Sequence, residues 1–596
     1  MSDPLEDDPV ILAGFPASEG IAKGNVLRVA WSVPQVRSAT TAGRKASRRE
    51  VERFRAALEW ARGRLEILKA ETETRLGVVE ARIFDPQILM LEDPEVVEGT
   101  ERYIRENRLT AARAFEWRML ELKERWSRTT HPMVLDRLND LQDLRLRVLS
   151  RLLDLPSPWH IESAGGVVAV ARNLTPSLVA RLEPASVVAI ATDEGSRTSH
   201  WAILARSLQI PAAVGLGDVL DRTRDGQAII VDGSSGRVVI EPDAHETERF
   251  EQRRLTLRDW RRVPADPNDG TVARNRQHFT LRANLDLPGE AGRAREHGAE
   301  GVGLFRTEFL AVGRREMPEE EEQYHAYREV ARHFPAHPVL IRTFDLGGDK
   351  FPVFLRAPFE ENPLLGRRGV RVCADEPGLF LTQLRAILRA AVHGEIRIMA
   401  PMVNTVGEVE VVRELLAAAG DCLHRAGIPF GGDIKVGAMI ETPAAALNAD
   451  SLAAHVDFLS LGTNDLVQYT LAVDRSNTRL AHLYDPLHPT VLRLVSMVAR
   501  AGHEAGIEVS ACGEMAGRPA GALALAGLGV EVLSVAWHSL PEIRSLLRNR
   551  PIEGLRAAAV AAMEADTQSQ ARRILAEALG SAADPGLFPF ESRRLS

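Results

Sequence analysis

Cysteine is scarce in this sequence, and a long apolar run is missing. Three cysteines, Cys373, Cys422 and Cys512, are widely separated and odd in number, which argues against a disulfide framework and indicates a reducing compartment. Residues 1–9 are acidic and polar, without the basic and apolar segments of a signal peptide. No stretch reaches the roughly 18 apolar residues of a membrane-spanning helix. We therefore expect a cytoplasmic protein without membrane insertion.

An excess of basic charge is also missing. The 74 lysines and arginines are outnumbered by 82 aspartates and glutamates, and the net charge is -8. No dominant Lys/Arg stripe appears, so nothing favours a nucleic-acid partner. The G-x-x-x-x-G-K-[ST] pattern of a Walker-type ATP site is absent as well. What remains is a chain of 596 residues, 45% of them hydrophobic, enough for roughly three to five globular domains.

The most informative stretch surrounds His200. An apolar run at 186–191 predicts a strand, and a helical pattern begins after a small polar turn. His200 should therefore lie in the first turn of a helix, behind the N-cap candidates Thr198 and Ser199. The positive end of a helix disfavours an imidazolium and favours a bound anion. His200 is thus a candidate nucleophile that becomes phosphorylated, and the alternative is a histidine that only ends a helix cap.

Apolar periodicity divides the first half of the chain. Runs at 10–15 and 24–29 have the composition of strands, whereas apolar residues recur every three or four positions between about 40 and 153. The latter pattern predicts a helical bundle. Further strand runs follow from Gly165, and we expect the two early strands to join that sheet, with the bundle inserted between them. The polar piece 264–270, which contains Pro and Gly, is the best linker candidate.

Strand-like and helix-like segments alternate after about residue 275. Eight short apolar runs, each followed by helical sequence, lie at 280–284, 301–305, 339–342, 396–400, 435–440, 457–461, 508–511 and 530–534. Eight βα units are typical of a closed (β/α)8 barrel, with a doubly wound open sheet as the alternative. The predicted fold class is therefore multidomain α/β: a β/α phosphohistidine domain with an inserted helical subdomain, followed by a TIM-type barrel.

Polar residues follow five of these runs, and a barrel gathers such residues at one face. They are Arg306, Arg342, Glu441, Asn464, Asp465 and Cys512, with Arg475 in the loop beyond. Arginine forks suit carboxylate and phosphate oxygens, and carboxylates suit Mg²⁺. Singly, each residue also has a structural explanation, such as a surface ion pair, a helix start or a small core position. Together they predict a site for a small polyanion and a divalent cation.

Longer motifs give the chain a family resemblance. The motifs are Gly301-Val-Gly-Leu-Phe-Arg-Thr-Glu-Phe-Leu310, Arg342-Thr-Phe-Asp-Leu-Gly-Gly-Asp-Lys350, Glu361-Asn-Pro-Leu-Leu-Gly366, Glu441-Thr-Pro-Ala-Ala445, Gly462-Thr-Asn-Asp-Leu466, Leu471-Ala-Val-Asp-Arg475 and Cys512-Gly-Glu514. On these motifs, the chain from about residue 12 to about 577 resembles enzyme I of the bacterial phosphotransferase system, the phosphoenolpyruvate–protein phosphotransferases. The length and order of the matches make this resemblance specific.

The resemblance implies a role for each candidate residue. His200 matches the phosphorylated histidine, and Cys512 matches the acid that protonates C3 of the enolpyruvate leaving group. The residues that match the phosphoenolpyruvate-binding set are Arg306, Arg342, Asn464 and Arg475. The residues that match the Mg²⁺ ligands are Glu441 and Asp465. Arg368 is also expected to face the phosphate.

The resemblance also implies partners and a reaction. In the family, the barrel forms a homodimer and the helical subdomain docks the phosphocarrier protein HPr. The implied activity is autophosphorylation of His200 from phosphoenolpyruvate and transfer to an HPr-type carrier, the first step of the sugar phosphotransferase system. A swivel at the linker is implied, because His200 belongs to a different domain from the barrel.

The helical region also carries many acidic residues. They either form a docking surface for a basic partner or a solvated helix face, and they are Glu66, Glu71, Glu73, Glu80, Glu92, Asp93 and Glu95.

Six segments follow from these assignments. The predicted limits are 1–39 for the first part of the phosphohistidine domain, 40–153 for the helical partner-docking subdomain, 154–241 for the rest of the phosphohistidine domain, 242–274 for a linker helix and hinge, 275–577 for the phosphoenolpyruvate-binding and dimerisation barrel, and 578–596 for a tail.

Three residues depart from the family pattern. Ser196 stands where a second glycine is usual, Trp201 follows the histidine in place of a small residue, and Pro86 should kink or break the first helical hairpin. These departures bear on partner choice and on the rate of transfer. Two alternative functions are a pyruvate phosphate dikinase-like enzyme and a regulatory phosphorelay enzyme of a nitrogen branch. The first would need a nucleotide-grasp domain and the second a sensor domain, and neither is expected here.

Overall fold

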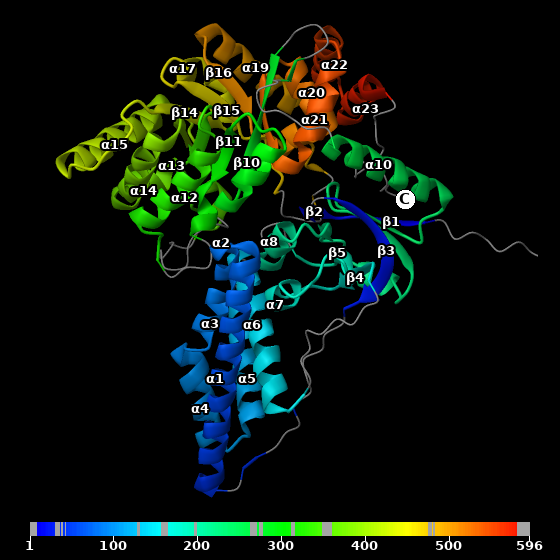
Figure 1. The fold of residues 1–596 in the computed structure, drawn as a ribbon, viewed down its shortest axis with the longest axis vertical. Helices are drawn as coiled ribbons and strands as arrows, with labels where there is room; N and C mark the ends of the chain where they lie inside the picture. Colours follow the sequence, from blue (N-terminus) through cyan, green and yellow to red (C-terminus); the bar gives the residue numbers. More distant parts are fainter. Residues whose placement is uncertain are drawn as a thin grey trace, which may run out of the picture. The chain divides into compact units, whose positions relative to one another are not determined.

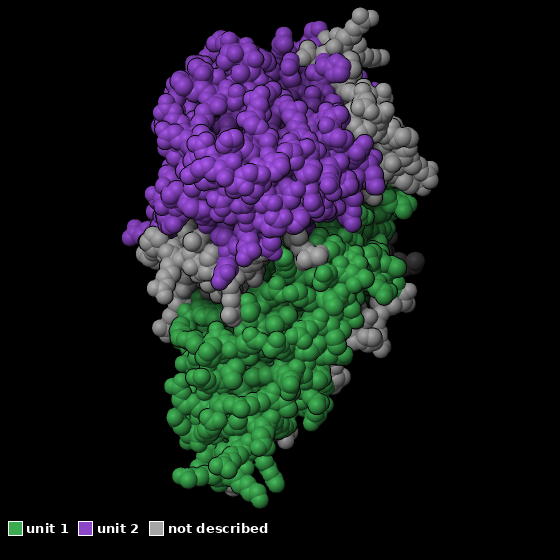
Figure 2. All heavy atoms as spheres, turned by 60° about the vertical axis from the view of Figure 1, so that its left-hand side comes forward, with its two compact units in different colours: residues 1–254 green, residues 255–596 purple. Residues whose placement is uncertain are grey.

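In a computed structural model the chain forms two compact units, residues 1–254 and 255–596, which Figure 2 distinguishes by colour. The structure describes residues 9–18, 20–29, 36, 40–41, 43–127, 132–155, 165–195, 199–262, 271–272, 278–311, 316–347, 360–474, 480 and 483–580. Within these ranges, no helix has the length and apolar character needed to cross a membrane. Each unit is built on its own sheet.

The first unit contains a mixed sheet with the strand order β1-β8-β7-β3-β4-β5-β6-β2. The strands are β1 (Val10–Ala13), β2 (Phe15–Ser18), β3 (Ile21–Arg28), β4 (Val167–Ala171), β5 (Val187–Thr192), β6 (Ala212–Val214), β7 (Ala228–Asp232) and β8 (Arg237–Ile240). β3 pairs in parallel with β4 and antiparallel with β7. β3 therefore lies inside the sheet formed with residues 167–240, and β1 and β2 are its two edge strands. The predicted joining of the early strands to this sheet is confirmed.

Short helices connect the strands of this sheet, and a longer one follows it. They are α7 (Pro176–Val179), α8 (His200–Ser207), α9 (Val219–Arg222) and α10 (Ala244–Arg262). The core of the sheet is made of small and β-branched side chains, among them Val170, Ala189 and Val231, all fully buried. Such residues suit strands because branched side chains pack well on a pleated surface.

The helical insert lies between β3 and β4 and forms an elongated bundle (Figure 1). Its elements are α1 (Gly43–Leu76), α2 (Val78–Ala81), η1 (Arg82–Phe84), α3 (Asp85–Met90), α4 (Pro94–Glu106), α5 (Ala111–Ser127) and α6 (Pro132–Leu152). The buried residues of α1, such as Phe54, Leu58 and Leu65, recur every three or four positions and face the bundle. Phe54 packs against Phe115 of α5 with ring centroids 5.7 Å apart.

Pro86 breaks the bundle where the sequence predicts it. The chain tightens into η1 and restarts as α3, with Pro86 in the first turn of the new helix. A proline there removes no intrahelical hydrogen bond, because the first N–H groups of a helix have no partner within it. The interruption shortens the first hairpin without disturbing its core, since Ile83 and Phe84 remain buried.

The second unit closes into a barrel. Its parallel strands are β10 (His278–Leu285), β11 (Val302–Arg306), β12 (Val339–Arg342), β13 (Ile396–Ala400), β14 (Lys435–Ile440), β15 (Phe458–Leu461), β16 (Glu508–Ala511) and β17 (Val532–Ala536). Closure follows from the pairing of β10 with both β17 and β11. A short strand, β9 (Thr271–Val272), adds antiparallel to β10. The predicted (β/α)8 barrel is confirmed, and the open-sheet alternative is wrong.

Helices surround this barrel (Figure 1). They are α11 (Ala291–Glu296), α12 (Glu320–His333), α13 (Val370–Asp375), α14 (Pro377–Ala390), α15 (Val406–Arg425), α16 (Pro443–Leu447), α17 (Ala449–Ala453), α18 (Thr463–Leu471), α19 (Pro489–Ala505), α20 (Pro519–Gly527), α21 (Leu540–Arg548), α22 (Ile552–Glu564) and α23 (Gln568–Leu579). Strands such as β12 are buried along their whole length, because helices cover one face and the barrel core fills the other.

An ion network closes the amino-terminal end of the barrel. Arg282 of β10 makes two hydrogen bonds to Glu508 of β16, at 2.6 and 2.8 Å. Arg397 of β13 reaches the same carboxylate at 3.3 Å and also pairs with the exposed Glu395 at 2.6 Å. Burial would raise the pKa of Glu508, but the two arginines outweigh it and the pKa is lowered. The network thus ties three strands together around one buried charge pair.

Replacing Glu508 with Ala should destabilise the barrel strongly. The change leaves the buried Arg282 without its carboxylate, and we expect the free energy of unfolding to fall by roughly 3 kcal/mol. E395A is the matched control, because it removes an exposed partner from the same network and should cost about 0.5 kcal/mol or less. Denaturant unfolding followed by fluorescence measures both variants. Equal losses of unfolding free energy in E508A and E395A would contradict the role of Glu508 as the partner that neutralises the buried Arg282.

Candidate active site

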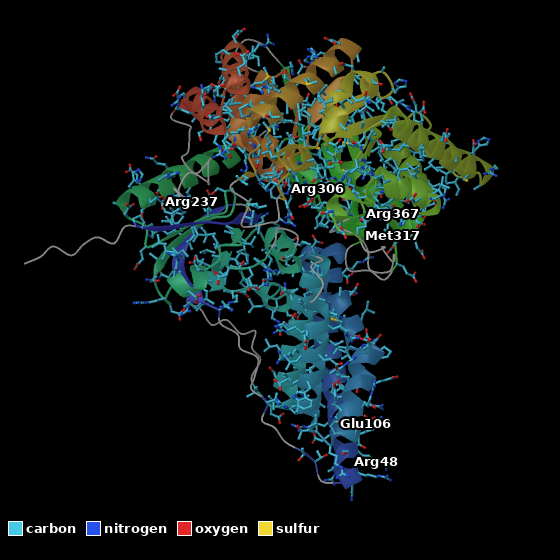
Figure 3. All side chains as sticks on the ribbon, turned by 180° about the vertical axis from the view of Figure 1, so that it is seen from behind. Arg48, Glu106, Arg237, Arg306, Met317 and Arg367 are labelled. Atoms are coloured by element: carbon cyan, nitrogen blue, oxygen red, sulfur yellow. The ribbon has the colours of Figure 1, made fainter. Side chains whose placement is uncertain are left out.

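The carboxyl ends of the barrel strands carry the predicted residues. Arg306 ends β11 and Arg342 ends β12, Glu441 directly follows β14, Asp465 lies in α18 after β15, and Cys512 directly follows β16. Parallel barrel strands all end at one face, so these side chains belong to the same rim. Figure 3 labels Arg306 on the barrel unit. The structure therefore brings five of the predicted residues to one end of the barrel.

Arg342 is a fixed cation at this end. Its guanidinium is buried and donates to Glu308 at 2.7 Å, and it lies 3.4 Å from Asp345. The backbone N–H of Asp345 donates to the same oxygen of Glu308 at 2.9 Å. Burial opposes the charge of Arg342, but Glu308 and Asp345 outweigh it and raise its pKa above the ordinary value. The charge of Arg342 is therefore present at any working pH.

Arg368 links two carboxylates of the site. Its fork donates to both oxygens of Asp345, at 3.1 and 2.7 Å, and reaches Asp465 at 3.2 Å. Such paired contacts fix orientation as well as charge. Gly347 permits this packing, because its φ is +135° and a Cβ there would lie 2.2 Å from Cβ of Arg368. Arg368 is expected from the resemblance to face a phosphate, but in this structure its fork holds the protein's own carboxylates.

Glu441 is a buried acid of the site with a strongly raised pKa. It is 1% exposed, and one of its oxygens accepts the backbone N–H of Met402 at 2.6 Å. Burial, and then repulsion from Asp465 and Asp345, raises the pKa of Glu441 to about 8. A Cβ on Gly462 would lie 2.8 Å from Cβ of Glu441, so the glycine allows the two strand ends to come this close.

The charges around Glu441 do not balance. Among the described residues, two guanidiniums, those of Arg342 and Arg368, interact with four carboxylates. The carboxylates are Glu308, Asp345, Glu441 and Asp465. Fully ionised, these six groups have a formal charge of minus two. Oxygen-rich surroundings with this charge fit a hard divalent cation held by Glu441 and Asp465, with waters and substrate oxygens as its other ligands.

Cys512 lies in an apolar pocket beside these charges. It is 2% exposed and packs with Leu304, Leu340, Met399, Met439 and Phe458. Its thiol receives a hydrogen bond from Ser460 at 3.4 Å. Burial raises the pKa of Cys512, because a thiolate is poorly solvated there. The residue is therefore a protonated thiol at neutral pH, which suits an acid and not a nucleophile.

Arg306 and Asn464 form a more open part of the rim. Arg306 lies 3.0 Å from Asp286 and 3.5 Å from Glu514. Asn464 donates to Glu514 at 3.3 Å and accepts its backbone N–H at 2.9 Å. Both predicted residues thus meet at Glu514, the last residue of the motif Cys512-Gly-Glu514, to which no role had been assigned. Arg475, the remaining predicted arginine, lies outside the described residues.

His200 starts α8, with Ser199 at the N-cap. The predicted position is confirmed, although the side chain of Ser199 makes no cap hydrogen bond. Nδ1 of His200 lies 3.3 Å from Asp140, which is fully buried on α6 of the helical insert. The other oxygen of Asp140 accepts a hydrogen bond from Gln87 at 3.1 Å. The neighbours that lie outside the described residues are Ser196, Arg197 and Thr198.

Trp201, a departure from the family pattern, is a core residue. It is 1% exposed, and its indole N–H donates to Asn173 at 3.2 Å. The amide of Asn173 in turn donates to Asn139 of α6 at 3.1 Å. Trp201 therefore connects the helix that carries His200 to the helical insert through two hydrogen bonds. Its bulk does not occupy the solvent side of His200.

The acidic residues of the insert are partly neutralised. Glu66 and Glu92 both pair with Arg62, at 2.8 and 2.6 Å, and Glu95 pairs with Arg125 at 2.8 Å. Asp93 instead accepts the backbone N–H of Glu95 at the start of α4. The remaining acids of the predicted set are exposed at Glu71 and Glu73 and buried at Glu80. At the end of the insert away from the sheet, Arg48 and Glu106 add charges of both signs (Figure 3).

Several contact residues had no sequence prediction. Glu308 and Asp345 stand inside the quoted motifs, two residues after Arg306 and three residues after Arg342, and this proximity is the signal that they share. Asp140 is an ordinary acidic position in a helical pattern, 60 residues before His200. Such a long-range contact cannot be found from local periodicity.

Known proteins resemble this chain over most of its length. Three family profiles for PEP-utilising enzymes match in order: the N-terminal region at 13–137, the mobile domain at 164–236 and the PEP-binding domain at 261–552. A phosphoenolpyruvate-protein phosphotransferase of Geobacillus stearothermophilus is 39% identical over 90% of this chain and 92% of its own length. Proteins of the same name are 38% identical in Priestia megaterium, over 90% of this chain and 93% of theirs, and 40% identical in Listeria monocytogenes, over 84% and 87%.

The three thiols should differ sharply in reactivity. Burial raises the pKa of both Cys373 and Cys512, whereas Cys422 is only half-buried. Only the thiolate is alkylated, so iodoacetamide at pH 8 should modify Cys422 alone in the folded protein, and all three thiols after denaturation. Peptide mass spectrometry measures the sites. Modification of Cys512 in the folded protein as fast as Cys422 would show that the pocket is open.

Proposed function

Because the chain belongs to the family of phosphoenolpyruvate–protein phosphotransferases, we propose that it phosphorylates its own His200 from phosphoenolpyruvate and passes the group to a histidine phosphocarrier. The observation that carries the proposal is the buried cluster of arginines and carboxylates at the carboxyl end of the barrel, together with a helix-terminal histidine in the other unit. Phosphoryl transfer depends on positioning and on neutralising charge, and this cluster supplies both.

Substrate binding belongs to the open part of the rim. Arg306, Asn464 and Arg475 are proposed to bind the carboxylate and phosphate of phosphoenolpyruvate, next to the fixed charge of Arg342. Phosphoenolpyruvate is anionic and the cluster is rich in carboxylates, so substrate and cation are proposed to bind together. Glu441 and Asp465 are proposed to hold Mg²⁺, which supplies charge neutralisation to the phosphate oxygens when bound.

The barrel residues then assist departure of the product. The P–O bond of phosphoenolpyruvate breaks as the N–P bond to His200 forms, and the enolate that remains takes a proton at C3 to become pyruvate. Cys512 is proposed as the donor of that proton, because burial keeps its thiol protonated. A rim arginine stays charged throughout, since the raised pKa of Arg342 prevents it from acting as an acid.

His200 is proposed to take the phosphoryl group on Nε2. Nδ1 faces the buried carboxylate of Asp140 at 3.3 Å, and a carboxylate beside one ring nitrogen holds the proton there and leaves the other nitrogen with its lone pair. Asp140 belongs to the helical insert, so the contact applies when His200 lies against that insert. For the barrel half-reaction, the hinge near residues 242–274 is proposed to release this domain.

The carrier that receives the phosphoryl group is proposed to be an HPr-type protein. An HPr-type protein with a basic face suits the exposed acids of the insert, Glu71 and Glu73. Ion pairs to Arg62 and Arg125 reduce the net acidity of this surface, so apolar contacts should contribute to docking as well. The proposed limits of the domains, a homodimer formed through the barrel and a cytoplasmic location remain predictions.

Replacing His200 with Ala should abolish labelling by phosphoenolpyruvate that carries radioactive phosphate. In the unaltered protein the label should be acid-labile and base-stable, and NMR of the ³¹P nucleus should assign it to Nε2. H245A is the matched control, because His245 is an exposed histidine of the same unit and its loss should leave labelling unchanged. Persistent labelling of H200A would refute the proposal, and a label on Nδ1 would remove the role of Asp140.

Binding of Mg²⁺ should depend on the ionisation of Glu441. Its folded-state pKa of about 8 lies above the ordinary value, so at neutral pH the cation must displace a proton. Apparent affinity should rise about tenfold per pH unit up to pH 8 and then level off. By the same linkage, the stability of the metal-free protein should decline as pH rises towards 8, and Mg²⁺ should restore it.

Calorimetry with Mg²⁺ alone measures both affinity and proton release. E441Q should remove the proton release and most of the affinity, whereas E410Q, at an exposed position of α15, should match the unaltered protein. Affinity that does not change between pH 6 and 8 would contradict a site at Glu441.

A further inference from the structure

Ser460 occupies an unusual position in the barrel core. It lies on β15 and is fully buried, two residues after Phe458, which packs in the apolar cluster around Cys512. Residues two apart on a strand share a face, so Ser460 points to the same side as that cluster. A hydroxyl buried among apolar side chains is costly unless it is hydrogen-bonded. Its hydroxyl donates to the sulfur of Cys512 at 3.4 Å.

The direction of this hydrogen bond matters. Cys512 is held by its backbone, because its N–H donates to Leu461 at 3.0 Å and its carbonyl accepts from Asn284 at 3.0 Å. The thiol also donates to the carbonyl of Leu461 at 3.7 Å, so the sulfur accepts a hydrogen bond from Ser460 while its own proton points to a second acceptor. A donor aimed at sulfur interacts more strongly with a thiolate than with a thiol, because hydrogen bonds to charged groups are the stronger ones.

We propose that Ser460 is a positioning residue for the reaction, which stabilises the thiolate left on Cys512 after its proton has moved to C3 of the enolpyruvate. The inference rests on the proposed function, in which Cys512 is the acid. The S–H bond breaks and a C–H bond forms at C3, the enolate becomes the ketone of pyruvate, and the sulfur keeps the electron pair. Water returns the proton to the sulfur after the product leaves.

The charged groups around Cys512 leave room for such a role. Arg342 and Arg306 favour the thiolate, and Glu441 opposes it. Burial is the largest influence and raises the pKa of Cys512, whereas the hydrogen bond from Ser460 lowers it. Without Ser460, the thiol would be a weaker acid and would give up its proton more slowly. Ser460 therefore keeps the buried thiol of Cys512 acidic enough to give its proton to C3 of the enolpyruvate.

A double-mutant cycle tests the inference. S460A should slow formation of pyruvate in a single turnover by roughly tenfold to a hundredfold, with little change in the Kd of phosphoenolpyruvate. In a C512A background, S460A should slow formation of pyruvate by less than about threefold. S460T keeps the hydroxyl and should restore most of the rate. S510A is the matched control, since Ser510 is equally buried on β16 but donates to the carbonyl of Leu459.

A second measurement does not depend on turnover. In a C422S background, the pH at which Cys512 becomes reactive to iodoacetamide should move upward by about one to two units in S460A and stay unchanged in S510A. The role of Ser460 would be overturned if S460A slowed pyruvate formation equally with and without Cys512. It would also be overturned if the pH dependence of Cys512 alkylation were the same in S460A as in the unaltered serine background. If C512A itself turned over at the normal rate, the acid assignment in the proposed function would fail, and the inference with it. Loss of labelling in H200A would be unaffected by either result.

Discussion

Opposed charges buried together govern the carboxyl end of this barrel. Arg342 and Arg368 are each bonded to carboxylates that are themselves buried, and the cluster still carries more negative than positive charge among the described residues. Charges at such depth are costly unless they are paired. Several carboxylate oxygens gathered at this depth suit a hard divalent cation, which the proposed function assigns to Mg²⁺. Burial and the neighbouring carboxylates of Asp465 and Asp345 raise the pKa of Glu441 to about 8.

The barrel and the first unit divide the chemistry between them. The barrel holds the proposed acid, Cys512, and the buried guanidiniums of Arg342 and Arg368, whereas His200 lies in the other unit, beside a carboxylate of the helical insert. Neither set is sufficient for transfer by itself. In the proposed transfer, His200 leaves Asp140 of the helical insert before it meets a substrate in the barrel.

The architecture could be predicted because its signals are periodic. Eight apolar runs with helical sequence between them specify a barrel, and the insert follows from spacing of three and four residues. Residues at strand ends, such as Arg306 and Glu441, could be predicted for the same reason, since topology alone brings them together. Contacts that depend on packing could not. Asp140 meets His200 across 60 residues of sequence, and Ser460 looks like any strand residue until Cys512, at the end of the adjacent strand β16, is seen beside it. The motif match likewise did not predict the contacts of Arg368 with Asp345 and Asp465.

Exchange of isotope between pyruvate and phosphoenolpyruvate tests the central claim most directly. The full chain is mixed with Mg²⁺, phosphoenolpyruvate and carbon-labelled pyruvate, with no carrier present. A phosphohistidine formed reversibly in the barrel must return its phosphoryl group to labelled pyruvate, so the label should enter phosphoenolpyruvate. The exchange should disappear when Glu441 and Asp465 are both replaced by their amides, although His200 is intact. Undiminished exchange in that variant would contradict a transfer that depends on the buried carboxylates of the barrel.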